Sequence, residues 1–149
     1  MKPGRKLGEI LTDKKIISEE QLNLALEEQK TTGEFLGRVL VTHGWMNETD
    51  LLEALSEQFN IAFIHLDNSQ INWEAALQYS YALLHEHCCI PINQDHVSVT
   101  VAICDPLDAW VMSEIESQAR GRTVELALAL KSEIKNALEE LTRRSVGRH

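Results

Sequence analysis

The first sixty residues carry one sequence motif twice, at an offset of 29 positions. Residues 6–29 and 35–58 share nine identities in 24 aligned positions. A self-similar period of this length is typical of proteins that stack one supersecondary unit per repeat. In the first copy the shared residues are Leu7, Gly8, Leu11, Glu19, Leu22, Ala25, Leu26, Glu28 and Gln29. We therefore expect residues 1–66 to form a tandem repeat in which each copy is one helical hairpin.

The second helix of each hairpin begins with a recognisable capping residue. Ser18 is followed three residues later by Gln21, which is the pattern of a capping box. Asn47 stands before Glu48 and Asp50, and acidic side chains are favourable in the first turn of a helix. Beyond each cap, leucine and alanine recur at intervals of three and four residues, which predicts an amphipathic helix with one buried face.

The pattern changes after an apolar extended piece at 61–66, where the polar cluster 67–70 indicates a boundary. Residues 67–142 are expected to form a small α/β subdomain, and residues 143–149 a loose tail or linker. Within the subdomain we expect strands at 88–92, 97–103 and 123–130. We expect one helix at 72–86, a second that begins at Asp105 and Pro106 and ends at Gly121, and a third at 133–142 that is capped by Ser132. The first two strands should form a hairpin and the last two a parallel pair. The predicted fold class is α+β: a tandem helical-hairpin repeat followed by a small three-stranded sheet with helices.

Charge and apolar composition exclude several classes of function. A net charge of −9 opposes nucleic-acid binding, because polyanions are bound by basic surfaces. No segment approaches the roughly 20 apolar residues of a membrane span, and the N-terminus lacks the apolar stretch of a signal peptide. The three cysteines show no disulfide pattern. We expect a cytoplasmic protein with no direct membrane insertion.

The chemistry-bearing residues do not indicate an enzyme or a metal site. The sequence contains no GxxxxGK[ST] loop, no G-x-S-x-G and no HExxH, so we expect no catalytic residues and no cofactor. His85, His87, Cys88 and Cys89 are zinc-type ligands, but no second pair lies at a zinc-finger interval, and we expect no metal. The isolated His43 and His65 are expected to have ordinary surface or turn roles.

The repeat resembles the paired 24-residue motifs of the MshEN domain, the N-terminal domain of type II secretion and type IV pilus assembly ATPases. The family pattern of a basic residue, Leu-Gly and a capped helix ending in Leu-x-x-Gln is followed by both copies from Leu-Gly onward. Lys6 holds the basic first position of the first copy, whereas Phe35 holds it in the second, where nucleotide-binding members carry Arg or Lys. The segment around Pro91, Cys104 to Pro106 and Gly121 also resembles the small α/β unit of that domain.

The resemblance implies two alternative functions for the chain. Some family members bind cyclic di-GMP across the two motifs, and others dock the ATPase onto an inner-membrane platform protein without binding nucleotide. The chain would act on an ATPase core in cis or in trans, in the cytoplasm or peripherally at the inner membrane through a partner. The ligand-binding residues implied are Lys6, Leu7, Gly8, Ile17, Leu22, Leu26, Gln29, Phe35, Leu36, Gly37, Met46, Leu51, Leu55 and Gln58.

Several of these residues also have purely structural interpretations. Glycine inside a helix costs about 1 kcal/mol relative to alanine, so Gly8 and Gly37 serve either close approach of a ligand or tight packing of two helices. Phe35 can stack on a guanine or be buried in the core. Gln29 and Gln58 can bind a base edge or hydrogen bond at a helix end.

Overall fold

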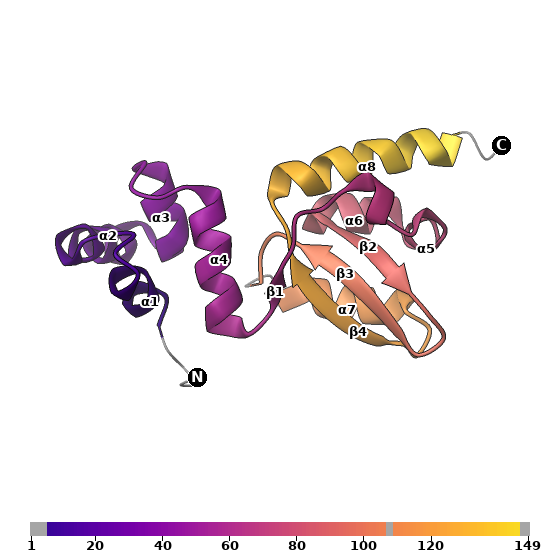
Figure 1. Ribbon diagram of the computed structural model, residues 1–149, viewed down its shortest axis with the longest axis horizontal. Coiled ribbons are helices and arrows are strands. Elements are labelled where there is room, and N and C mark those ends of the chain that lie inside the picture. The colour runs from indigo at the N-terminus through magenta and orange to yellow at the C-terminus, as the bar shows by residue number, and fades with distance from the viewer. Residues whose placement is uncertain (1–5, 107–108, 147–149) are drawn as a thin grey trace. The chain divides into compact units, whose positions relative to one another are not determined.

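The computed structural model describes residues 6–106 and 109–146, and the chain divides into two compact units, Met1–Asn60 and Ile61–His149 (Figure 1). The first unit is helical, and the second contains a sheet with helices. The predicted α+β class is confirmed. In the described ranges, every helix is too short or too polar to cross a bilayer.

Each copy of the repeat forms a helical hairpin in the first unit. The helices are α1 Leu7–Asp13, α2 Glu19–Thr32, α3 Leu36–Thr42 and α4 Glu48–Phe59. The predicted caps are confirmed. The Gln21 amide donates to the Ser18 hydroxyl at 3.0 Å, and the Ser18 amide donates to the Gln21 side chain at 2.9 Å. Asn47 accepts from the Asp50 amide at 2.8 Å.

The two hairpins of this unit pack crosswise. Helix α1 contacts α4, and α2 contacts α3, so each copy packs mainly on the other copy. Fully buried side chains lie at equivalent positions of the two copies: Ile10 and Leu11 of α1 correspond to Val39 and Leu40 of α3. Burial of one such side chain stabilises the fold by roughly 1.5 to 3 kcal/mol. The repeat thus builds its core from equivalent positions of its two copies.

The second unit is built on a four-stranded sheet in the order β1-β4-β3-β2. Its strands are β1 Ala62–Phe63, β2 Cys89–Gln94, β3 Ser98–Ile103 and β4 Thr123–Leu128. The predicted hairpin and parallel pair are confirmed as β2 with β3 and β3 with β4. The sheet has one strand more than the three expected, because β1 pairs in parallel with β4. A two-residue strand leaves too short an alternating pattern to be assigned from sequence.

Both faces of this sheet are covered. Val101, Ala102 and Ile103 are consecutive in β3 and all are buried, although neighbouring side chains of a strand point to opposite faces. Helices α6 Tyr81–His87 and α8 Lys131–Val146 contact β2, and α7 Ala109–Gln118 contacts β4. A short helix, α5 Trp73–Ala76, and a 3-10 turn, η1 Asn68–Gln70, precede them.

Two helices of this unit differ from the prediction. The single helix expected at 72–86 is α5 and α6, because Ser80 begins a new helix by accepting from the Leu83 amide at 3.4 Å. Pro106 lies in a turn, and the described part of α7 begins at Ala109. Residues 107–108, which the helix expected after the Asp105 cap would include, lie outside the described residues, so that cap stays a prediction.

Helix α8 is longer than predicted at both ends. It begins at Lys131, which places Ser132 inside the helix and not at its cap. It continues to Val146, so residues 143–146 are helical and are not the loose tail expected. Arg143 and Arg144 both bind Glu140, at 2.9 and 3.0 Å, and Arg144 lies 4.4 Å from the centre of the Trp73 ring. Basic side chains also favour the last turn of a helix. Residues 147–149 of the expected tail lie outside the described ranges.

Candidate functional site

The two Leu-Gly segments open the first helix of each hairpin and are buried. A Cβ atom added to Gly8 would lie 2.9 Å from Cδ1 of Leu22, and one added to Gly37 would lie 2.5 Å from Cδ1 of Leu51. Both distances are far below an ordinary carbon contact of about 3.5 to 4.0 Å. Each glycine therefore makes room for the leucine of the second helix in its own copy, which agrees with the packing interpretation.

The candidate residues of the two copies differ in exposure. In the first copy Lys6 and Leu26 are exposed, and Leu22 and Gln29 are half-buried. In the second copy the equivalent Leu51 and Leu55 are each 3% exposed, and Phe35 and Gln58 are half-buried. The other candidates are buried in both copies: Leu7, Gly8 and Ile17, and Leu36, Gly37 and Met46.

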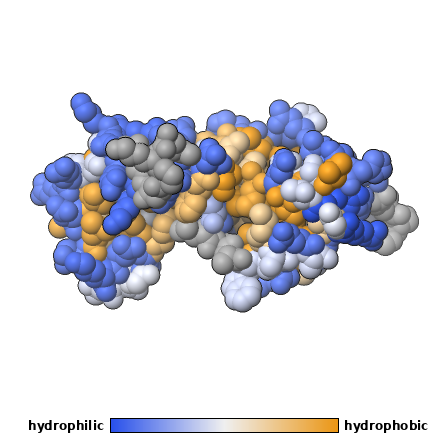
Figure 2. Space-filling view, turned by 90° about the horizontal axis from the view of Figure 1, so that it is seen from below, coloured by the Kyte–Doolittle hydropathy of each residue, from blue (hydrophilic) through white to orange (hydrophobic). Residues whose placement is uncertain are grey.

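The exposed and half-buried candidates of the first copy are one lysine, two leucines and one glutamine. Leu22, Leu26 and Gln29 follow one another at spacings of four and three residues, so they share one face of α2. Leu22 reaches across to Gly8, two residues after Lys6. Within the described residues, the side chain of Gln29 makes no hydrogen bond. Figure 2 shows hydrophobic surface lying among hydrophilic residues of this unit. The four residues Lys6, Leu22, Leu26 and Gln29 are called the α2 face below.

The corresponding region of the second copy is filled by an aromatic ring. Cε2 of Phe35 would lie 2.7 Å from a Cβ atom added to Gly37, so the ring packs against this glycine. Phe35 is also the N-cap residue of α3 and makes no side-chain cap hydrogen bond. The phenylalanine thus takes part in packing and remains half-exposed.

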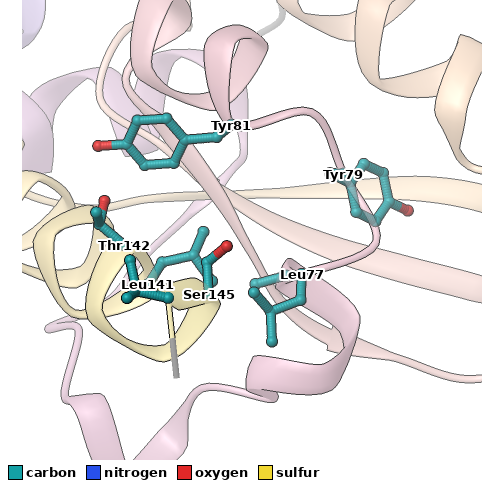
Figure 3. Close-up of a pocket in the computed structure, with 8 residues that line it drawn as sticks. Leu77, Tyr79, Tyr81, Leu141, Thr142 and Ser145 are labelled. Carbon is teal, nitrogen blue, oxygen red and sulfur yellow. The ribbon is translucent and has the colours of Figure 1, made fainter. Parts of the chain in front are cut away.

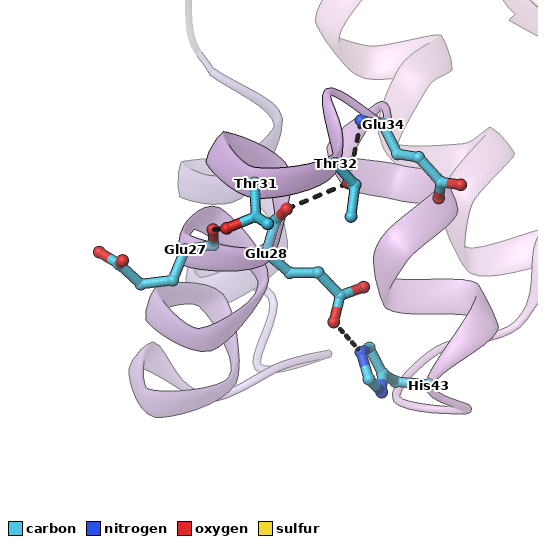
Figure 4. A network of polar contacts seen from close by, with 6 residues as sticks. All are labelled: Glu27, Glu28, Thr31, Thr32, Glu34 and His43. Carbon is cyan, nitrogen blue, oxygen red and sulfur yellow. Dashed lines mark hydrogen bonds and ion pairs between the residues drawn. The ribbon is translucent and has the colours of Figure 1, made fainter.

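Two ion pairs join the copies in a reciprocal way. Lys14, after α1, lies 3.4 Å from Glu57 of α4, and His43, after α3, lies 2.9 Å from Glu28 of α2 (Figure 4). Lys14 and His43 are equivalent in the repeat, as are Glu28 and Glu57. His43 also stacks on Trp45 with ring centres 4.5 Å apart. His43 was expected to have only a surface or turn role. The identical Glu28 and Glu57 at equivalent positions of the two copies were the sequence signal for these contacts.

The second unit contains a hollow between α8 and the segment that joins α5 to α6. It has a volume of about 390 Å³ and is lined by apolar groups of Leu77, Leu141 and Val146 and by the ring of Tyr81. Figure 3 shows the Tyr79 hydroxyl directed away from the α8 residues; it donates to Gln94 at 3.0 Å. Burial raises the pKa of Tyr79. This hollow offers no acid, base or nucleophile arrangement.

The zinc-type residues His85, His87, Cys88 and Cys89 do not form part of a metal-binding group among the described residues. Across residues 6–106 and 109–146, no three His, Cys, Asp or Glu side chains are grouped so that they could hold a metal ion. His87 and Cys88 end α6, whereas Cys89 is the first residue of β2.

Comparison with known proteins identifies the family. Residues 59–148 match the MshEN domain family, and the two Leu-Gly motifs precede this range. The chain is 29% identical to the type IV pilus assembly ATPase PilB of Myxococcus xanthus over 134 residues, and 36% identical to PilB of Thermus thermophilus over 141 residues. These alignments cover 90% and 94% of the chain but only 24% and 15% of the relatives.

One solved structure similar to this chain is that of MshE with cdg, cyclic di-GMP. It superimposes with a TM-score of 0.81 and 26% sequence identity, over 92% of this chain and 99% of the MshE chain. The similarity includes both units, so the architecture of the repeat followed by the sheet is shared.

Proposed function

The chain belongs to the MshEN domain family, and on that premise we propose that it is a non-catalytic regulatory module of a type II secretion or type IV pilus assembly ATPase. In this proposal it binds cyclic di-GMP through the two Leu-Gly motifs and acts on the ATPase core, in cis or in trans, in the cytoplasm. The observation that carries the proposal is the similarity to MshE with cyclic di-GMP along nearly the whole of that chain.

The α2 face supports this function through its chemistry. Cyclic di-GMP presents two phosphates and two purines, which need positive charge, apolar contact and hydrogen-bonding groups. Lys6 offers the charge, the exposed parts of Leu22 and Leu26 offer contact to a ring, and the Gln29 amide can both donate and accept at a base edge. Because the chain carries a net charge of −9, a dianionic ligand depends on such a local cation.

The second copy would contribute mainly apolar contact. Phe35 is half-exposed, so part of its ring remains available to stack on a base, an interaction of about 1 to 3 kcal/mol. Arg38 lies in the same helix, but it is 3.9 Å from Glu48 and its charge is partly balanced there. We therefore propose an asymmetric site in which the first copy holds phosphate and the second stacks.

Calorimetric titration with cyclic di-GMP, with GTP as the control ligand, tests the proposal. The chain provides a matched pair of variants, because Leu26 and Leu24 are 36% and 55% exposed on the same helix. Leu26 belongs to the α2 face, whereas Leu24 is two positions away on another side of α2. Leu26→Ala should weaken binding, and Leu24→Ala should leave it unchanged. No heat of binding at millimolar ligand, or equal losses in both variants, would count against this site.

Docking onto a platform protein is the second candidate function, and exposed apolar residues that are not among the candidate ligand-binding residues favour it. Leu24 and Phe59 are 55% and 39% exposed. In this alternative, capture of the platform protein's cytoplasmic domain is weakened by Leu24→Ala and is insensitive to cyclic di-GMP. The two leucine variants therefore distinguish the functions: one variant affects the nucleotide and the other affects the partner.

A further inference from the structure

Two cysteines stand opposite each other where the β2–β3 hairpin meets α6. Cys89 and Ile103 are the last pair of the antiparallel ladder, and Cys88 and Cys104 are the residues directly beyond them. Both residues are half-buried thiols, and they share a side-chain hydrogen bond. The fold thus holds the two thiols in contact.

Cys88 is also reachable from solvent. It ends α6 in the left-handed conformation, with φ 50°, and lines an open cleft of about 450 Å³ between α6 and α8. The charged and titratable groups on this cleft are Lys131, Lys135 and Glu139 of α8 and His85 and Glu86 of α6. Asp105 follows Cys104 in the chain. A small oxidant can therefore approach Cys88 between two lysine side chains.

The same surroundings divide the two thiols into an attacking and a resolving partner. The hydrogen bond from Cys104 lowers the pKa of Cys88 to about 7, and Lys131 and Lys135 add to this against the effect of burial. The hydrogen bond to Cys88, followed by burial, raises the pKa of Cys104. Because the thiolate is the nucleophile, Cys88 reacts first.

We propose that Cys88 and Cys104 form a redox modification site that converts reversibly between a dithiol and a disulfide when it meets a peroxide. The Cys88 thiolate attacks one oxygen of hydrogen peroxide, the O–O bond breaks, and the sulfur becomes a sulfenic acid while the other oxygen leaves as water after protonation. The Cys104 thiol then attacks that sulfur, the S–O bond breaks and a second water leaves. Together the two thiols lose two electrons and two protons, and the peroxide is reduced to two waters.

Cys89 is the matched control within the chain. It is fully buried and lies opposite Ile103 in the ladder. Because Cys88 and Cys89 are adjacent in sequence, a mapped peptide alone does not tell them apart. The assignment therefore depends on the three variants Cys88→Ser, Cys89→Ser and Cys104→Ser, each checked for folding by circular dichroism.

The test exposes the full chain to hydrogen peroxide and then counts maleimide-reactive thiols after unfolding, with and without dithiothreitol. The unsubstituted protein should lose two of its three thiols within a monomer and regain them on reduction. Cys89→Ser should lose both that it has. Cys104→Ser should stop at a sulfenic acid that dimedone traps, and Cys88→Ser should keep its thiols. Alkylation of Cys88 by iodoacetamide should accelerate as the pH rises through about 7.

Three results would overturn the proposal. One is a folded protein that keeps all three thiols in peroxide. A second is a disulfide that forms only between molecules. The third is a Cys89→Ser variant that forms no disulfide while Cys88→Ser still does. None of these outcomes bears on nucleotide binding, which involves other residues.

Discussion

The two copies of the repeat share their residues and their packing, yet they differ in what they leave exposed. Leu26 of the first copy is 36% exposed, and its equivalent Leu55 is 3% exposed. At the start of the motif, Lys6 is exposed whereas Phe35 lies against its own glycine. The identical positions thus specify the crossed hairpins, while equivalent positions of the two copies differ in exposure. A duplicated motif therefore need not give two equivalent sites.

Removal of one leucine in each copy should give the largest difference between them. Leu55→Ala should lower the free energy of unfolding by about 2 to 5 kcal/mol, because it leaves a cavity in the core. Leu26→Ala should lower it by less than about 1 kcal/mol, because that side chain already contacts solvent. The measurement is urea denaturation followed by Trp45 fluorescence, with Trp73 and Trp110 replaced by phenylalanine. Equal losses would mean that the two copies are packed alike.

Substitutions at the first motif position of the two copies, Lys6→Ala and Phe35→Arg, should change the affinity for cyclic di-GMP in opposite directions. Lys6→Ala should weaken binding of cyclic di-GMP by about 1 to 3 kcal/mol, the scale of a charge-assisted hydrogen bond, and added salt should reduce that difference. Phe35→Arg should strengthen binding, since the guanidinium adds a second cation beside the ligand and its planar group can still stack on a base. Calorimetry at two salt concentrations measures both effects. A Lys6→Ala variant that binds normally would exclude the phosphate role of Lys6.

Local signals were sufficient to predict most of the fold. The caps at Ser18 and Asn47 set the starts of α2 and α4, because a cap depends on residues three positions apart. The misplaced boundaries depend on distant residues. The strand β1 exists because Ala62 pairs with Ala127, and the break before α6 is held by Gln118, which accepts from the Ser80 amide at 2.8 Å. A local sequence pattern does not indicate which distant residues will become such partners.

The candidate site was only partly predictable, for a related reason. The repeat indicated which residues are equivalent, but equivalent residues were expected to be used alike. The structure separates them by exposure, and exposure depends on tertiary packing that the motif does not specify. The reciprocal contacts of Lys14 and His43 were missed because their partners, Glu57 and Glu28, lie in the other copy.

Alanine at the two glycines should have a smaller and unequal effect on stability. At Gly37 the added carbon would meet Leu51, which is buried, and the ring of Phe35. Overpacking costs about 1 to 3 kcal/mol and the gain in helix propensity returns about 1, so Gly37→Ala should lose up to about 2 kcal/mol. At Gly8 the neighbour is half-exposed Leu22, which can turn away, and Gly8→Ala should change stability by less than about 0.5 kcal/mol. Thermal and urea unfolding of both variants measure this difference.

The reciprocal contacts should give the smallest effect, distinguished by its dependence on salt. All four side chains are more than one-third exposed, so solvent screens each pair and its coupling energy should stay below about 1 kcal/mol. Double-mutant cycles combine Glu28→Gln with His43→Asn, and Glu57→Gln with Lys14→Met. The coupling of Lys14 to Glu57 should fall as salt is added, because salt screens exposed charges. The coupling of His43 to Glu28 includes a hydrogen bond of 2.9 Å and should fall less. If both couplings fall by the same fraction, the two copies are joined by the same kind of contact, and they are more alike than their sequences suggest.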